Sequence, residues 1–262
     1  MQAKKSLGQN FLKSQKALRE IIDASSLSES DIVLEVGPGK GILTEKLLEK
    51  VKKVIAVEKD DDLIGFLTEK FKTFVDSGKL EIINADILDF KPENHFKDAS
   101  YKIVANIPYY ITGQFLRKFL SEAKAPNLMV LMLQKEVAKR IVGREEESIL
   151  SISVKVFGNP KYISTVKAEY FSPKPKVDSA ILLIDNISKD FFKEIDENKF
   201  FEAVKAGFLH KRKKLIRNLE SVFEPIDLER TFEKCEINKN IRAEKISLEM
   251  WKKLLINLKG NI

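Results

Sequence analysis

The chain has 262 residues, 44% hydrophobic and 32% charged, a balance that is ordinary for a folded protein of one large or two modest domains. Its single cysteine, Cys235, excludes an internal disulfide and a cysteine-based metal site, so we expect a reducing compartment, the cytoplasm. The absence of an apolar signal region and of a run of ~18–20 apolar residues argues against a membrane protein, and the net charge of +7 suits a polyanionic partner.

Hydrophobic patterning predicts alternating helices and strands as far as residue 142. Apolar, β-branched runs predict strands over 32–36, 54–57, 80–85, 103–106 and 128–133. Apolar residues near helical spacing predict helices over 14–24, 42–50, 60–76, 112–123 and 135–142. This alternation is typical of βαβ units, and it therefore predicts an α/β fold with a parallel sheet.

The pattern changes in the second half of the chain. Three apolar segments, at 151–157, 162–170 and 180–184, follow one another too closely for full helices between them, and they predict a partly antiparallel edge of the sheet. The later segments predict helices over 200–219, 227–235 and 247–258. We therefore expect an α/β domain over 1–187 and a small all-α domain over 188–262.

A glycine-rich loop, Gly37 to Gly41, joins the 32–36 strand to the next helix. Glycines in such a loop tolerate positive φ and let the backbone approach a ligand. A dinucleotide-binding fingerprint would need a third glycine where this chain has Ile42, which disfavours a dehydrogenase. Together with Glu35, the loop instead resembles the E-x-G-x-G loop of class I methyltransferases, which bind S-adenosylmethionine.

Acidic residues end the next two predicted strands. Glu58 could accept hydrogen bonds from both hydroxyls of a ribose, and Asp86 could accept one from the amino group of an adenine. Charge-assisted bonds of this kind contribute roughly 1.5–3 kcal/mol each. The alternative is that each carboxylate is a surface acid or a helix N-cap.

The run Asn106-Ile107-Pro108-Tyr109 ends the 103–106 strand, because Pro108 has no N–H to extend the ladder. Ligands of open α/β sheets bind outside the carboxyl ends of the strands. The Asn106 carbonyl and nearby backbone carbonyls could accept both N–H bonds of an exocyclic amino group, while Tyr109 or Tyr110 stacks on the base. The run resembles the NPPY motif of methyltransferases that act on adenine; alternatively it is a strand-end cap and a turn.

The whole chain resembles the KsgA-type ribosomal RNA small-subunit adenine dimethyltransferase family. The resemblance is carried, in order, by GQNFL (8–12), LEVGPGKGILT (34–44), VIAVEKD (54–60), NADIL (84–88), NIPYYIT (106–112), LQKEVAKRI (133–141), YFSPKPKVDSAIL (170–182), FLHKRKKLIRNL (208–219) and RAEKISLEMW (242–251). It implies a class I, Rossmann-like methyltransferase sheet with a small helical C-terminal domain. The implied reaction is S-adenosylmethionine-dependent N6,N6-dimethylation of two adjacent adenosines in the 3′-terminal hairpin loop of small-subunit (16S) rRNA during ribosome assembly.

The resemblance also implies roles for individual residues. Those that would bind the cofactor are Asn10, Leu12, Gly37, Gly39, Glu58, Asp86 and Asn106. Those that would act on the base are Asn106 and Pro108, with the aromatics Tyr109 and Phe171 flanking it. The chain departs from the family at Tyr110, where many members have asparagine.

Five basic residues lie close together in the predicted 200–219 helix, namely Lys211, Arg212, Lys213, Lys214 and Arg217. They predict a surface that contacts rRNA phosphates, or alternatively a solvated helix face. The implied partners are the small ribosomal subunit and its rRNA, and we expect a cytoplasmic monomer that needs neither membrane nor metal. Two other functions stay open: a large-subunit rRNA adenine methyltransferase of the macrolide-resistance type, and a non-catalytic RNA-binding assembly factor. The FSPKPKVDS string and the basic tail argue against the first, and the intact loop, Glu58 and Asn106 against the second.

Overall fold

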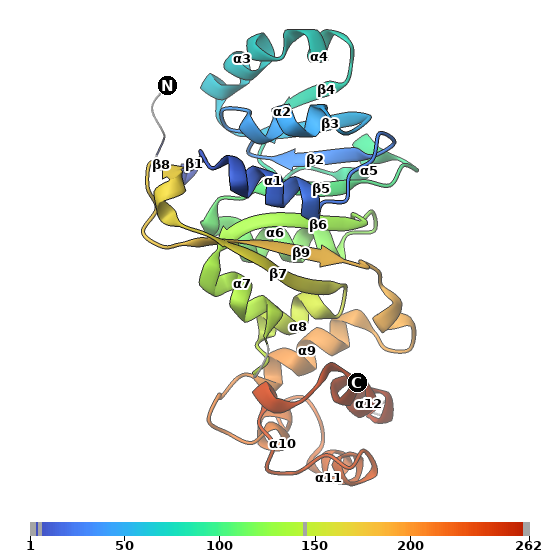
Figure 1. Cartoon of the computed structure of the whole chain (residues 1–262). Coiled ribbons are helices and arrows are strands. Elements are labelled where there is room, and N and C mark those ends of the chain that lie inside the picture. The colour runs from blue at the N-terminus through green and yellow to red at the C-terminus, as the bar shows by residue number, and fades with distance from the viewer. Residues whose placement is uncertain (1–3, 5–6, 144–145, 259–262) are drawn as a thin grey trace. The chain divides into compact units, whose positions relative to one another are not determined.

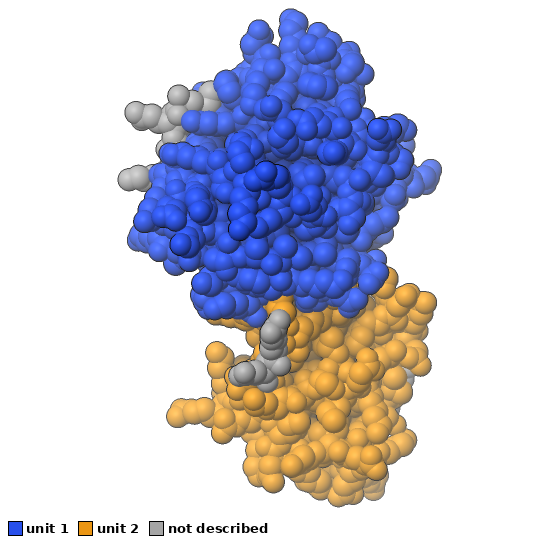
Figure 2. Space-filling model, viewed as in Figure 1, with its two compact units in different colours: residues 1–139, 159–187 blue, residues 140–158, 188–262 orange. Residues whose placement is uncertain are grey.

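The computed structural model describes residues 4, 7–143 and 146–258. The chain divides into two compact units, which Figure 2 shows in different colours. Unit 1 comprises residues 1–139 and 159–187, and unit 2 comprises residues 140–158 and 188–262. No helix in the described parts of the chain is long and apolar enough to cross a membrane.

A mixed sheet forms the centre of unit 1 (Figure 1). Within the described residues its order is β4-β3-β2-β5-β6-β9-β7. The strands are β2 (Ile32–Val36), β3 (Lys53–Glu58), β4 (Leu80–Asn84), β5 (Lys102–Asn106), β6 (Leu128–Gln134), β7 (Asn159–Val166) and β9 (Ser179–Asp185). Strands β2 to β6 pair in parallel, and β9 lies antiparallel between β6 and β7. The order reverses at β2, so the carboxyl ends of β2 and β5 meet at a topological switch point, where such sheets bind ligands.

The helices of unit 1 largely follow the predicted periodicity. They are α1 (Gln15–Ala24), α2 (Ile42–Leu48), α3 (Asp61–Lys70), α4 (Lys72–Asp76), α5 (Pro92–Phe96), α6 (Thr112–Ser121) and α7 (Lys135–Val142), which continues into unit 2. Short 3₁₀ turns cover Tyr109–Ile111 and Ala168–Tyr170. A separate two-stranded sheet pairs β1 (Phe11–Leu12) with β8 (Phe171–Ser172) and so ties the N-terminal segment to unit 1.

The predicted strand at 151–157 is wrong, because this segment is the helix α8 (Ile149–Lys155). Its start is a reciprocal capping box, in which the side chain of Ser148 accepts from the Ser151 N–H and the side chain of Ser151 accepts from the Ser148 N–H. Short apolar runs are ambiguous between strand and helix, and the cap decides this one. Residues 140–158 accordingly belong to unit 2, whereas the sequence placed them with the sheet.

Unit 2 is helical around a core that includes the buried side chains of Phe200, Phe232 and Trp251. Besides α8 it contains α9 (Glu197–Gly207), α10 (Leu215–Leu219), α11 (Pro225–Lys234) and α12 (Leu248–Asn257), with 3₁₀ turns at Asp190–Lys193 and Ala243–Lys245.

The single helix predicted over 200–219 is also wrong, because α9 ends at Gly207 and α10 begins at Leu215. The Asn218 side chain causes the break: its amide donates to the carbonyl oxygens of Gly207, at 2.6 Å, and of His210, at 3.1 Å. These bonds satisfy the carbonyl of the last residue of α9 and a carbonyl beyond its end, and they hold the chain in a turn. Four of the basic residues, 211–214, therefore lie exposed outside a helix, and Arg217 alone among the five lies in α10.

Candidate cofactor and catalytic site

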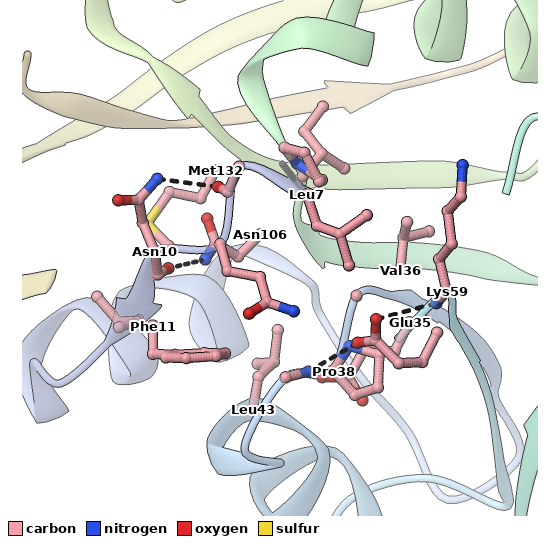
Figure 3. Close-up of a pocket in the computed structure, with 18 of the residues that line it drawn as sticks. Leu7, Asn10, Phe11, Glu35, Val36, Pro38, Leu43, Lys59, Asn106 and Met132 are labelled. Atoms are coloured by element: carbon pink, nitrogen blue, oxygen red, sulfur yellow. Dashed lines mark hydrogen bonds between the residues drawn. The ribbon is translucent and has the colours of Figure 1, made fainter. Parts of the chain in front are cut away.

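A pocket of about 300 Å³ lies within unit 1, at the carboxyl ends of β2, β3, β4 and β5. Parallel strands direct their carboxyl ends to one edge of the sheet, which is why residues distant in sequence meet here. Every predicted cofactor residue lines this pocket: Asn10, Leu12, Gly37, Gly39, Glu58, Asp86 and Asn106. Pro108 and Tyr109 line it as well. Figure 3 shows several of these residues, with Asn10 and Asn106 side by side.

The glycine loop presents bare backbone to the pocket. Gly37 and Gly39 have φ values of +62° and +59°, in the left-handed region that favours glycine. The Gly37 N–H donates to the Val57 carbonyl at 2.9 Å, which holds the loop against β3. A Cβ at Gly39 would lie 3.0 Å from the Phe11 ring, so a side chain there would press on the opposite wall.

Glu58 is held rigidly at the end of β3, with only 7% of its surface exposed. Its Oε1 atom accepts from the N–H groups of Lys59, at 2.9 Å, and Asp60, at 3.0 Å, and its Oε2 atom accepts from Gly39 N–H at 3.3 Å. Burial raises the pKa of this carboxyl, and the three N–H donors oppose that shift. Oε2 retains a lone pair for a further donor, such as a ribose hydroxyl.

Asp86 lies just past β4, where its carboxylate forms a salt bridge with Lys59 at 2.7 Å and accepts from the Leu88 N–H at 2.9 Å. The hydrogen bond from Lys59, followed by the one from Leu88, holds the pKa of Asp86 below its ordinary value. Asp86 is therefore ionised at neutral pH and offers acceptor oxygens to the pocket.

Asn106 ends β5, and its side chain has a defined orientation. The Nδ2 atom donates to the backbone carbonyl of Asn10 at 3.1 Å, which Figure 3 marks with a dashed line. A backbone carbonyl can only accept, so the amide nitrogen must face Asn10 and Oδ1 must lie on the other side. The side chain thus offers an acceptor to a ligand, the arrangement expected for holding an amino group.

Tyr109 and Phe171 have different surroundings. Tyr109 is half-buried at the pocket, where its hydroxyl lies 2.7 Å from the Ser179 hydroxyl. Phe171 is 3% exposed, belongs to the hydrophobic core and pairs with Leu12 across the β1–β8 sheet. The structure therefore does not bring Phe171 into the pocket; its neighbour Ser172 lines the wall instead.

Glu35 also lines the pocket, although its sequence pattern assigned it no site role beyond membership of the E-x-G-x-G loop. It is 1% exposed, and its Oε2 atom has no hydrogen-bond partner among the described residues. Burial, with a smaller contribution from the charge of Glu58, raises the pKa of Glu35 to about 8. A buried carboxyl with one oxygen that lacks a partner among the described residues, beside a bare glycine loop, fits a ligand that carries an amino group. The amino acid end of S-adenosylmethionine has one, so this pocket fits the expected cofactor. The glutamate of the E-x-G-x-G string was the signal available.

Comparisons with known proteins agree with this geometry. Ribosomal RNA small subunit methyltransferase A of Dehalococcoides mccartyi (strain CBDB1) is 43% identical over 266 aligned residues, which cover 100% of this chain and 90% of the relative. A solved dimethyladenosine transferase from Plasmodium falciparum has a TM-score of 0.80 at 28% identity, covering 95% of this chain and 97% of that one. The 23S rRNA methyltransferase ErmE has a TM-score of 0.77, with coverages of 96% and 100%, and at 24% identity it shows the fold alone.

These structural neighbours confirm the expected class I methyltransferase fold. A family model described as ribosomal RNA adenine dimethylase matches residues 1–259, nearly the whole chain. The sequence match, the fold and the pocket point the same way: this chain belongs to the ribosomal RNA adenine dimethylase family.

Proposed function

We propose that this chain dimethylates the N6 amino groups of two adjacent adenosines in the 3′-terminal hairpin loop of small-subunit rRNA, during ribosome assembly. The methyl donor is S-adenosylmethionine, in keeping with the family and the pocket. The observation that carries the proposal is the orientation of Asn106. Its amide nitrogen is committed to Asn10, so its oxygen is the atom offered to an exocyclic amine.

The glycine loop, Glu35, Glu58 and Asp86 would hold the cofactor, whose sulfonium supplies an electrophilic methyl group when bound. The target adenine must leave its stack, and Tyr109 would offer a flat surface against it, worth about 1–3 kcal/mol. Phe171 remains a predicted second aromatic, and it could stack only after leaving the core in which it is buried.

Asn106 would act by accepting hydrogen bonds from the adenine amine, together with nearby backbone carbonyls. The amine nitrogen would gain positive charge as its bond to the methyl group forms and the methyl–sulfur bond breaks, which would leave a neutral thioether and a surplus proton that passes to solvent. These acceptors would therefore bind more strongly in the transition state than in the ground state. Most of the remaining acceleration would come from holding the amine in line with the methyl group.

The choice of the small subunit rests on the relatives. The Dehalococcoides protein is named a small subunit methyltransferase, and the Plasmodium protein a dimethyladenosine transferase. The large-subunit alternative has only a likeness of fold to support it. We further propose a cytoplasmic monomer that needs no metal. Residues 1–187 would form the catalytic domain and residues 188–262 the rRNA-binding domain. Residues 140–158, which belong to unit 2, would pack with the rRNA-binding domain.

The test is methyl transfer in vitro from radiolabelled S-adenosylmethionine to purified small and large ribosomal subunits that lack these modifications. We expect label in small-subunit rRNA alone, reaching four methyl groups per subunit if both adenosines receive two. Label in large-subunit rRNA would instead support the macrolide-resistance type. Binding of the small subunit without transfer would support the non-catalytic alternative.

A further inference from the structure

The N-terminal segment of residues 7–13, which we call the strap, lines the pocket and carries the carbonyl that orients Asn106. An asparagine amide can rotate by half a turn and exchange its oxygen for its nitrogen at little steric cost. In the rotated state Asn106 would present N–H donors to an amine that needs acceptors. The orientation of the amide therefore depends on where the strap holds the Asn10 carbonyl.

The strap is attached on both sides of Asn10. On the C-terminal side, Phe11 and Leu12 pair with β8. On the N-terminal side, the Gln9 side chain donates from Nε2 to Asp60 Oδ2 at 2.6 Å. The Lys4 ammonium contacts the other oxygen of Asp60, Oδ1, at 2.5 Å. A two-residue strand pair is a weak attachment by itself, because it contributes few ladder hydrogen bonds.

Asp60 is a firm anchor for this contact. Its side chain is 3% exposed and caps α3 by accepting from the Asp62 N–H at 3.2 Å. Its backbone N–H donates to Glu58 at 3.0 Å, so one turn holds both the strap and the acid predicted to bind the ribose. Burial raises the pKa of Asp60, but the hydrogen bonds from Lys4 and Gln9 outweigh that effect, and the pKa lies below its ordinary value.

We infer that Gln9 and Asp60 form a latch that positions the strap, and through the Asn10 carbonyl sets the sense of the Asn106 amide. Gln9 is thus a positioning residue for methyl transfer, and Asp60 couples the ribose end of the pocket to the amine end. This inference rests on the proposed function, because it assigns Asn106 to the adenine amine.

The first test compares Gln9→Ala with the parent in single-turnover methyl transfer at saturating cofactor and rRNA. The expected rate is lower by roughly tenfold or more, the scale of one hydrogen bond to a charged group, with rRNA affinity unchanged. Gln15→Ala is the matched control, because Gln15 is exposed at the start of α1 and does not line the pocket. A parental rate in Gln9→Ala would overturn the inference.

Two double variants separate positioning from general damage. In an Asn106→Ala background, Gln9→Ala should cause no further fall in rate, because no amide remains to be oriented. Gln9→Glu combined with Asp60→Asn restores the hydrogen bond with donor and acceptor exchanged, because the new amide at position 60 donates to the new carboxylate at position 9. The double variant should therefore be faster than Gln9→Glu alone. If the losses of rate in the two single variants add up in each of these double variants, the latch is contradicted.

A nuclear magnetic resonance measurement tests the latch without any activity. The side-chain amide signals of Asn106, assigned by their loss in Asn106→Ala, should shift in Gln9→Ala and stay in place in Gln15→Ala. Unchanged Asn106 signals in Gln9→Ala would refute the latch. If the parent transfers no methyl group to rRNA, the proposed function fails, and these signals still decide the latch.

Discussion

The pocket of unit 1 and the basic segment of unit 2, residues 208–219, differ in how firmly the structure holds their polar groups. Glu58 accepts from three N–H groups, and Asn106 is oriented by Asn10. Lys211 to Lys214 are exposed in a turn, and Arg217 forms an exposed ion pair with Glu220. Chemistry on a small cofactor needs preorganised groups, whereas contact with a phosphate backbone needs charge that can adapt.

Among variants of the pocket, Asn106→Ala should have the largest effect. We expect turnover to fall by roughly 10²–10³-fold, the scale seen when one preorganised group that stabilises developing charge is removed. The rRNA affinity should stay close to that of the parent. Single-turnover methylation at saturating rRNA measures the loss, and a normal rate there would defeat the proposed mechanism.

The next largest effect is expected from Glu58→Ala. Loss of the hydrogen bonds to the ribose should weaken S-adenosylmethionine binding by about 1.5–3 kcal/mol for each bond lost. Calorimetry with the purified chain measures this directly. Because the alanine variant also strips three N–H groups of their acceptor, a thermal melt must first show that it is folded. Unchanged affinity in a folded variant would remove Glu58 from the site.

The Glu35 variant tests whether burial raises the pKa of this carboxyl. Its pKa is raised in the folded chain, so the folded state holds the proton more tightly than the unfolded state does. Stability linked to Glu35 is therefore complete below its unfolded pKa, near 4.5, and is lost as the pH rises towards 8. Glu35→Gln, which resembles the protonated form, should remove a loss of at most about 1.4 kcal/mol per pH unit in this window.

Denaturant unfolding at pH 6, 7 and 8, without cofactor, measures that slope for the parent and for Glu35→Gln. We expect the variant to gain stability relative to the parent as the pH rises. Parallel pH profiles for the two proteins would show that Glu35 titrates normally.

The smallest effect is expected in the basic segment. Arg212→Ala with Lys213→Ala should weaken small-subunit binding and flatten the slope of log affinity against log salt by about one to two units, since each phosphate contact contributes roughly 0.7–0.9. Cofactor binding, and transfer at saturating subunits, should persist. The control pair Lys52→Ala with Lys72→Ala lowers the net charge equally at exposed positions of unit 1 that do not line the pocket. An unaltered slope in the Arg212 and Lys213 pair would place the docking surface elsewhere.

The pocket was more predictable from sequence than the basic segment, for a physical reason. Glu58 and Asn106 end parallel strands and Asp86 lies just past another, and the topology of such a sheet brings strand ends together without any knowledge of side-chain packing. The break between α9 and α10 depends instead on the buried Asn218 amide, a contact that periodicity does not report.

Three other features could not be predicted from sequence because they depend on tertiary packing or on an unusual cap. Phe171 resembled a base-stacking aromatic, but the β1–β8 pairing turns it into the core. Gln9 and Asp60 are 51 positions apart, and no local pattern pairs them. The helix α8 required recognition of a cap built from two serines rather than from serine and glutamate.

The most direct measurement is mass spectrometry of ribosomal RNA from a bacterial strain lacking its own enzyme of this family, supplied with the parent chain or with Asn106→Ala. We predict that the parent produces two adjacent N6,N6-dimethyladenosines near the 3′ end of small-subunit rRNA. Asn106→Ala, expressed at the same level, should leave both adenosines largely unmodified. Equal modification by the two proteins would contradict the role of Asn106, and modification of large-subunit rRNA would contradict the proposed substrate.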